Sequence, residues 1–260
     1  MRKLLLAIAA FMPILALNAQ TNIQEMYDLN RGHLTTTLEM FKSDNWGSTF
    51  FFTDIYHPND KTGPTDYYTE IARGLNFWKN SKLEALSLHV EWNGGLGEGY
   101  IVNNAWLFGV EYFMHNADFS NTFTFELMYK SITGQTDNVP LQFTFVWGMK
   151  DIFGVKGLMF SGFFDVWGEK QTWNVEDNNA LLGYRTEETD WVILSEPQIW
   201  YNIGQHFGCE NLNIGGEIEL AYNFSGGCKD PSFIGPLGVI YSNQNKGFTA
   251  TPAFGIKWVF

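Results

Sequence analysis

Long apolar runs, cysteine and basic residues are scarce in this sequence, and each shortage limits what the chain can be. After Leu17, no stretch approaches the roughly 20 apolar residues of a transmembrane helix. Lys and Arg total 16 against 28 Asp and Glu, which gives a formal net charge of −12. This acidity argues against nucleic-acid binding, since that requires a basic face. The two cysteines, Cys209 and Cys228, are compatible with one disulfide in an oxidising compartment.

The N-terminal residues have the pattern of a secretory signal peptide. Arg2 and Lys3 precede an apolar stretch from Leu4 to Leu17, which is too short to span a bilayer comfortably. We therefore expect a signal peptide over residues 1–19, rather than a retained N-terminal helix, and one domain over residues 20–260.

Beyond residue 20 the apolar residues recur at every second position. In the segment 86–93, Leu88 and Val90 alternate with polar residues, and the segments 122–131 and 212–224 repeat the pattern. Several such segments reach ten residues, the length that a tilted strand needs to cross an outer membrane. Strands of soluble proteins average about five or six residues. The sequence therefore predicts an all-β fold, a closed antiparallel transmembrane β-barrel of about 12 strands.

The expected strands are Asn22–Leu29, Leu34–Phe41, Gly47–Tyr56, Asp66–Trp78, Leu83–Asn93, Ala105–Met114, Thr122–Ser131, Leu141–Lys150, Gly157–Gly168, Trp191–Asn202, Leu212–Phe224 and Phe248–Phe260. The first of them has the weakest pattern. Cys209 and Cys228 flank one strand of this map, which predicts that they are not bonded to each other.

The connections on the two sides of this map differ in length. Short turns alternate with longer loops, as in outer-membrane barrels with short periplasmic turns and longer outer loops. The glycine-rich run at 94–99 and the stretches Glu169–Asp190 and Ser225–Gly247 are expected as outer loops. The last strand ends on the aromatic Phe260, as exported barrels typically do.

Two residues conflict with a simple alternation. Arg73 falls on the apolar face of its segment, so we expect a β-bulge between Glu70 and Gly74 that turns it inward, or a different register. Pro197 lies inside an expected strand, where it cannot donate a ladder hydrogen bond, and predicts a bulge or a constriction.

If the apolar face contacts lipid, the alternate positions line the barrel interior. This interior is rich in carboxylates and also carries aromatic rings, so it offers hydrogen bonds and ring faces to a solute and disfavours anions. The alternative is a plugged barrel in which these groups pair with one another. The candidate solute-binding residues are Phe50, Phe52, Asp54, Glu70, His89, Glu91, Glu111, Glu126, Asp165, Trp167, Glu196, Gln198, Trp200, Glu217 and Glu219.

Catalytic, metal and phosphate motifs are not expected. Ser87, His89 and Glu91 share one strand face, but a separation of roughly 7 Å per two-residue step argues against hydrogen bonds among them. No GxSxG motif is present and no His/Cys cluster has metal-ligand spacing. The run at 94–99 opens no helix, so it is not a phosphate cradle. We therefore expect no enzyme activity and no cofactor.

Several segments resemble an outer-membrane family that is grouped with the Tsx-like nucleoside-specific channel-forming proteins. The segments are TTTLEMFKSDNWGSTFFFTD (35–54), EIARGLNFW (70–78), SLHVEWNGG (87–95), LSEPQIWYN (194–202) and FGIKWVF (254–260). The resemblance covers most of the chain and implies a twelve-stranded barrel with a narrow, nucleoside-admitting lumen. It nominates Phe50, Phe52 and Asp54, together with Glu196, Gln198 and Trp200, as the matching positions.

The sequence thus predicts passive diffusion of small hydrophilic solutes, nucleosides foremost, through the outer membrane of a Gram-negative bacterium. The expected partners are outer-membrane lipid and lipopolysaccharide. A closed structural or interaction barrel is the main alternative. A conduit for hydrophobic solutes or a lipid-active enzyme is disfavoured by the polar interior and the missing triad.

Overall fold

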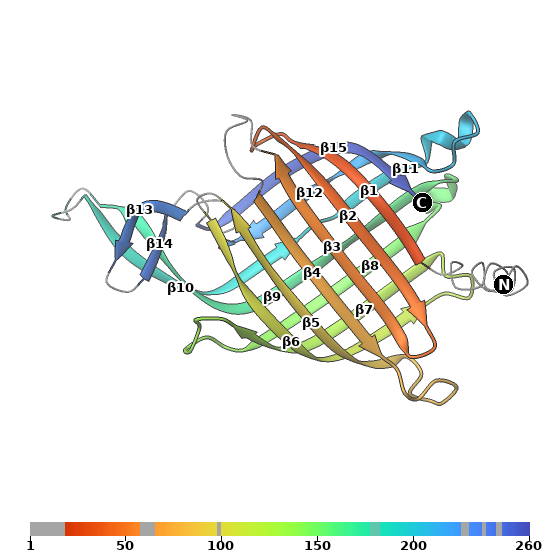
Figure 1. The fold of residues 1–260 in the computed structure, drawn as a ribbon, viewed down its shortest axis with the longest axis horizontal. Helices are drawn as coiled ribbons and strands as arrows, with labels where there is room; N and C mark the ends of the chain where they lie inside the picture. Colours follow the sequence, from red (N-terminus) through yellow and green to blue (C-terminus); the bar gives the residue numbers. More distant parts are fainter. Residues whose placement is uncertain are drawn as a thin grey trace, which may run out of the picture.

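One antiparallel sheet closes on itself to form the wall of a barrel (Figure 1). The structure, a computed structural model, describes residues 19–57, 66–97, 100–177, 179, 181, 183–224, 229–235, 238–242 and 246–260. Neighbours along the chain pair from β1 to β9, and β9 pairs with both β10 and β11. β12 then links β10 and β11 to β15, and β15 pairs with β1 to complete the ring.

The strands are β1 Ala19–Asp28, β2 His33–Asp44, β3 Gly47–His57, β4 Asp66–Leu75, β5 Leu86–Gly97, β6 Tyr100–His115, β7 Asn121–Ile132, β8 Leu141–Lys150, β9 Leu158–Glu176, β10 Tyr184–Ser195, β11 Gln198–Tyr201, β12 Leu212–Tyr222, β13 Lys229–Gly235, β14 Gly238–Ser242 and β15 Phe248–Val259. Two short 3-10 helices, η1 Ile152–Gly154 and η2 Ile203–His206, lie in connections.

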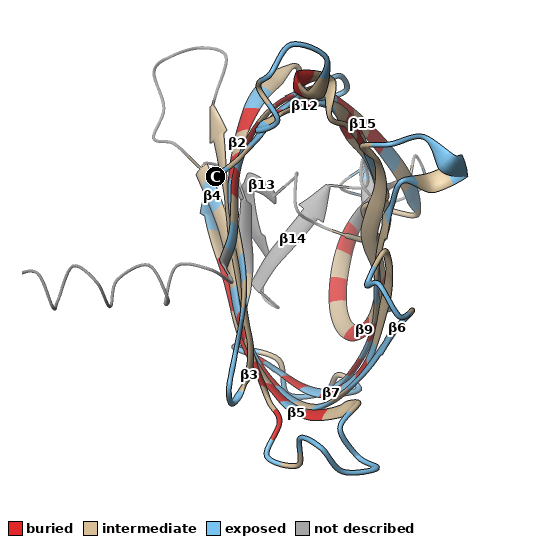
Figure 2. Ribbon diagram, turned by 90° about the vertical axis from the view of Figure 1, so that its right-hand side faces the viewer, coloured by how far each residue is buried: buried red, intermediate tan, exposed pale blue. Residues whose placement is uncertain are grey.

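The expected all-β barrel of twelve strands is confirmed. β10 and β11 occupy one position of the ring, and β13 and β14 lie outside it, so the fifteen described strands give twelve positions in the wall. The weakest expected strand, β1, forms a continuous ladder with β2 from Ala19 to Asp28. Figure 2 shows the oval ring that these strands enclose.

The alternating sequence pattern produces an inside-out distribution of polarity. Outward-facing Ile71, Leu127 and Phe143 are among the large apolar side chains that remain exposed. Inward-facing side chains such as Glu91, Lys130 and Asn22 are buried. A water-soluble protein places such groups the other way round, so the outer face requires an apolar environment.

Charged groups on the outer face lie towards the strand ends. Arg73, two residues before the end of β4, stays on the outer face in an unbroken register, so the expected bulge is wrong. Its guanidinium instead contacts Asp44 and Thr49, each at 2.8 Å. Towards the other end, Thr36 donates to Glu25 at 2.6 Å. These groups mark the two edges of the apolar belt.

The ladder breaks where proline was expected to disturb it. β10 ends at Ser195 and β11 begins at Gln198, with Pro197 between them. Gly162, on the neighbouring strand β9, has a φ of +153°, and a Cβ there would lie 2.4 Å from the carbonyl oxygen of Glu196. The two chains therefore approach closely at this interruption, which confirms the expected irregularity.

All three of the expected outer loops contain strand, and the stretch Ser225–Gly247 carries β13 and β14. Residues 94–97 extend β5 into a hairpin, and most of Glu169–Asp190 forms a ribbon of β9 and β10 with one register shift near Thr189. This ribbon projects from one end of the barrel, where β14 adds a short parallel pairing with β9 (Figure 1). The carboxyl terminus lies at the opposite end.

No helix within the described ranges is both long and apolar enough to cross a membrane. Cys209 has a free thiol. Cys228, which was expected not to be bonded to Cys209, lies outside the described residues.

Candidate solute-binding wall and its ionic clusters

The inner face carries the fifteen residues nominated from the sequence, but they divide into distinct environments. Phe50, Phe52 and Asp54 on β3, and Gln198 on β11, are partly exposed. Other nominated residues, among them His89, are buried. Glu70, Glu111, Asp165, Glu196, Glu217 and Glu219 are also partly exposed, whereas Glu91, Glu126, Trp167 and Trp200 are buried.

A strip of aromatic rings lies on the inner face of β3 and β4. The ring centroids of Phe50 and Phe52 are 5.9 Å apart, and those of Phe52 and Tyr68 are 5.6 Å apart. Carboxylates flank the strip: Tyr68 donates to Glu70 at 3.3 Å, and Asp54 pairs with Tyr68 across the two strands. All of these side chains are partly exposed, so the strip combines accessible ring faces with hydrogen-bond acceptors.

The two nominated tryptophans have a different environment. The Lys130 Nζ lies 4.0 Å from the ring centroid of Trp167, and the Lys257 Nζ lies 4.2 Å from that of Trp200. The side chains of Trp167 and Trp200 are only 5% and 1% exposed. Each ring therefore holds a lysine by a cation–π contact instead of offering a free face to a solute.

A second polar cluster joins β11, β12 and the β1–β2 connection. Gln198 donates to Glu217 at 2.8 Å and accepts from the Trp200 indole at 2.9 Å. Arg31 donates to both carboxylate oxygens of Glu219, at 2.6 and 2.7 Å. Both bonds come from one guanidinium nitrogen, Nη2, and this charge-assisted pair holds the β1–β2 connection against the inner face of β12.

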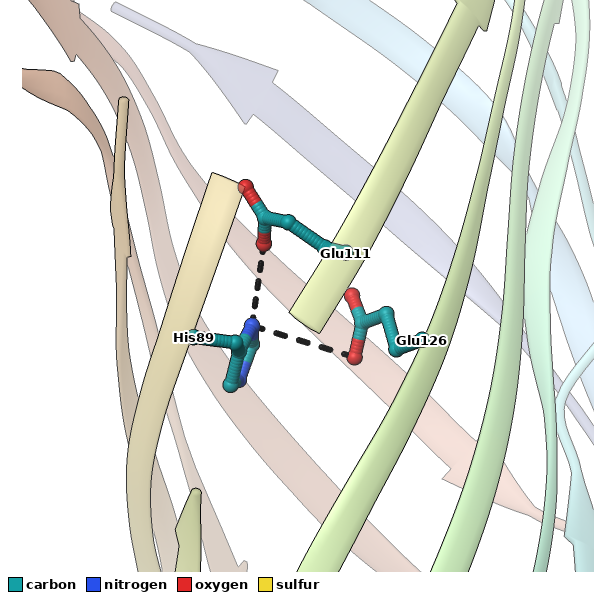
Figure 3. Close-up of side chains that lie close together, drawn as sticks. All are labelled: His89, Glu111 and Glu126. Carbon is teal, nitrogen blue, oxygen red and sulfur yellow. Dashed lines mark hydrogen bonds and ion pairs between the residues drawn. The ribbon is translucent and has the colours of Figure 1, made fainter. Parts of the chain in front are cut away.

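The third cluster is centred on His89 in β5 (Figure 3). Its Nδ1 lies 2.9 Å from Glu111 Oε2 and 4.0 Å from Glu126 Oε2. Its Nε2 lies 3.3 Å from Glu91 Oε2, and Asn93 donates to the other oxygen of Glu91 at 2.9 Å. Carboxylates from three adjacent strands thus surround one buried imidazole.

Register explains how these side chains meet. Glu111 pairs directly with Glu126 across β6 and β7, while His89 pairs with Gly74 on one side and Gly109 on the other. Because neither neighbour has a side chain, Glu111 can lean over: a Cβ at Gly74 would lie 2.3 Å from its Oε1. The glycines create the space that the carboxylate occupies.

Two sequence-based expectations about this cluster need correction. His89 and Glu91 were expected to lie beyond hydrogen-bond reach, because side chains two apart on a strand point in parallel. Glu91 instead bends along the strand and closes the gap to 3.3 Å. Metal-ligand spacing was also not expected, yet His89, Glu111 and Glu126 place one donor atom each within 4.8 Å of one another.

Sequence reasoning did not single out Tyr68, Arg31 or Asn93. Tyr68 and Asn93 have the same parity as the neighbouring inward carboxylates, so a full parity assignment would have found them. Arg31 lies in a connection between strands, where odd and even positions do not indicate which way a side chain faces. Its partner Glu219 is 188 residues away along the chain. No local signal in the sequence predicts that pair.

Comparison with known proteins identifies a family. A family model described as a domain of unknown function (DUF5020) matches residues 20–260. No curated protein matches the chain. A crystal structure of the NanC porin is similar over 92% of this chain and 98% of that one, with 8% identity and a TM-score of 0.49. The grouping with Tsx-like channels is not among these findings, so that resemblance stays a prediction.

Proposed function

The chain belongs to the DUF5020 family, and we propose that it is an outer-membrane channel for passive diffusion of small hydrophilic solutes. The proposal is supported by a closed ring of strands with an apolar outer face and a polar inner face. In lipid every backbone polar group must be satisfied, and a closed barrel satisfies them without an edge. Outer-membrane lipid and lipopolysaccharide would then surround the belt.

The orientation of the barrel follows from its two ends. Bacterial outer-membrane barrels have short turns towards the periplasm and longer extensions outside. We assign the end with the carboxyl terminus to the periplasm, and the β9–β10 ribbon to the cell exterior. The Gram-negative outer membrane and prior cleavage of residues 1–19 belong to this proposal.

The charge of the inner wall limits the solutes. Nine nominated positions are carboxylates. Within the described part of the chain, the basic residues that pair or interact electrostatically with them are His89, Lys130, Lys257 and Arg31. An acidic, low-dielectric passage disfavours anions, so neutral and cationic solutes are favoured.

Nucleosides are the solutes that we propose within this class. The single observation that carries this choice is the partly exposed strip of Phe50, Phe52 and Tyr68 beside Asp54 and Glu70. A base can stack on such rings, which contributes about 1–3 kcal/mol per base. The carboxylates accept hydrogen bonds from ribose hydroxyls.

A swelling assay with matched variants tests this choice. Liposomes containing the pure protein should swell faster in nucleosides than in sugars of equal size. Phe52→Leu on the inner face should reduce that preference about fivefold or more, the equivalent of losing 1 kcal/mol of stacking. Phe51→Leu, one residue away on the outer face, should keep it. Equal swelling for both solutes by the wild type would reduce the proposal to a general pore.

A closed structural barrel is the second candidate, because one observation favours it. Inward side chains such as Gln24, Asn22 and Glu91 are buried to 5% exposure or less, so parts of the interior are packed. Planar-bilayer recordings separate the two functions. A folded protein without measurable conductance would support the closed barrel and overturn the channel.

Catalysis is not part of the proposal. Glu111 and Glu91 hold the two ring nitrogens of His89, so neither nitrogen is placed to accept a proton from Ser87.

A further inference from the structure

We propose that His89, Glu111 and Glu126 bind a divalent transition-metal cation such as Zn²⁺ on the inner wall of the barrel. The site goes beyond solute diffusion, because it requires neither an open passage nor transport. It is assembled by β5, β6 and β7, whose side chains converge on one point (Figure 3).

The donor atoms fit the first coordination shell of such an ion. Zn²⁺ binds imidazole nitrogen and carboxylate oxygen at about 2.0–2.2 Å, which places neighbouring donors about 3–3.5 Å apart. The Nδ1 of His89 lies 2.9 Å from Glu111 Oε2 and 4.0 Å from Glu126 Oε2. Closing the second gap requires Glu126 to move by only about 1 Å.

The second shell is also that of a metal site. A ligating histidine usually donates its other ring N–H to a carboxylate, which fixes the tautomer and the orientation of the ring. Here Nε2 faces Glu91 at 3.3 Å, and Asn93 in turn donates to Glu91 at 2.9 Å. His89 is therefore held with Nδ1 directed at the two other carboxylates.

The charge around the site is not balanced by the protein. Lys130 interacts electrostatically with Glu70, Glu91, Asp165 and Glu169, and it also donates to Gln142 at 2.7 Å. His89 faces Glu91, Glu111 and Glu126. Within the described part of the chain, one lysine and one protonated imidazole are thus shared among six carboxylates. A bound dication displaces the Nδ1 proton of His89 and still adds one net positive charge.

A buried acceptor on the same row adds to this imbalance. Glu111 and Glu126 continue across the sheet through Thr144 to Asp165. The Oδ1 of Asp165 is buried and has no hydrogen-bond partner within the described part of the chain. Buried polar atoms are normally satisfied, so this acceptor, two strands from Glu126, adds to the excess of acidic acceptors on this part of the wall.

The test is Zn²⁺ titration by calorimetry of the full chain in detergent after chelator treatment. We expect one saturable site in the wild type, and its loss in His89→Gln and in Glu126→Gln. Glu91→Gln, which alters only the orienting group, should weaken binding about 10- to 100-fold. Glu217→Gln removes an inner-face carboxylate that contacts Gln198 and lies outside the His89 cluster. This variant should bind Zn²⁺ as the wild type does.

Folding is checked by heat-modifiable gel mobility. If the His89 or Glu126 variants do not fold, X-ray absorption of the Zn²⁺-loaded wild type decides, because it should show one imidazole with oxygen ligands. The absence of a saturable site in the wild type overturns the proposal. So does unchanged binding by folded His89→Gln, or a shell without imidazole.

Discussion

A single arginine placed at the middle of the outer face tests whether that face contacts lipid. Leu127 lies near the centre of β7, and its side chain is 57% exposed. Its cross-strand neighbours Val110 and Phe143 are also exposed apolar residues. Leu127→Arg therefore puts a charge into the centre of the apolar belt.

The depth of Leu127 follows from the geometry of its strand. β7 has 12 residues, and at about 3.4 Å per residue with a tilt of about 40° it rises about 30 Å. Leu127 lies about halfway up this rise, at the bilayer midplane, where arginine costs about 2–4 kcal/mol. Leu34 is the second residue of β2 and pairs with His57, the last residue of β3, so Leu34→Arg lies near the interface and should cost about 0–1 kcal/mol.

The assay is reversible urea unfolding in lipid vesicles, followed by tryptophan fluorescence. We expect the free energy of unfolding to fall by about 2–4 kcal/mol for Leu127→Arg and by no more than about 1 kcal/mol for Leu34→Arg. Surface substitutions that face water usually change stability by no more than about 0.5 kcal/mol. If both variants stayed within that range, the outer face would contact water and the barrel would not span a membrane.

Further predictions concern charge inside the barrel. Reversal potentials in a salt gradient should show cations passing in preference to anions, and an anion preference would contradict the acidic wall. Arg31→Met, which leaves Glu219 without its arginine partner, should lower the free energy of unfolding by about 1–2 kcal/mol. The more exposed Arg185→Met should change it by less than about 0.5 kcal/mol; equal losses would refute the special role of Arg31. Gly74→Ala should displace Glu111 and weaken Zn²⁺ binding about tenfold, in calorimetry of a barrel with normal gel mobility.

The wall of the barrel could be predicted from the sequence because lipid imposes a rule on it. Each residue of a spanning strand faces either hydrocarbon or the interior, so polarity must alternate with a period of two. The rule ends at the edges of the belt. The ribbon between Glu169 and Asp190 has no such alternation, and the sequence predicted a loop there. The segment Gln171–Glu176 nevertheless pairs with Tyr184–Thr189, because ladder hydrogen bonds do not depend on that pattern.

Arg73 shows the same limit from the other side. Its outward position looked like an error of register, and a bulge was invoked to correct it. At the end of a strand, however, an arginine reaches past the hydrocarbon to polar partners, and it does so here with Asp44 and Thr49. Depth along the strand, which parity does not report, decides whether an outward charge is tolerated.

The inner face could be predicted as a set of residues but not as a set of contacts. Parity identified His89, Glu111 and Glu126 as inward-facing, yet 22 residues separate His89 from Glu111 along the chain. Their contact depends on the strand register and on Gly74 leaving space for a carboxylate. Both are cross-strand properties, and a single sequence does not state them.

The excess of acid inside the barrel connects the two proposals. A carboxylate enclosed by protein and lipid cannot remain ionised without hydrogen bonds or a nearby cation. Lys257 and Lys130 are held over tryptophan rings, so neither is free to move among the acids. The remaining negative charge is neutralised by protons or by mobile or bound cations. A wall built in this way attracts cations along its length and holds one most strongly where an imidazole joins the carboxylates, at His89.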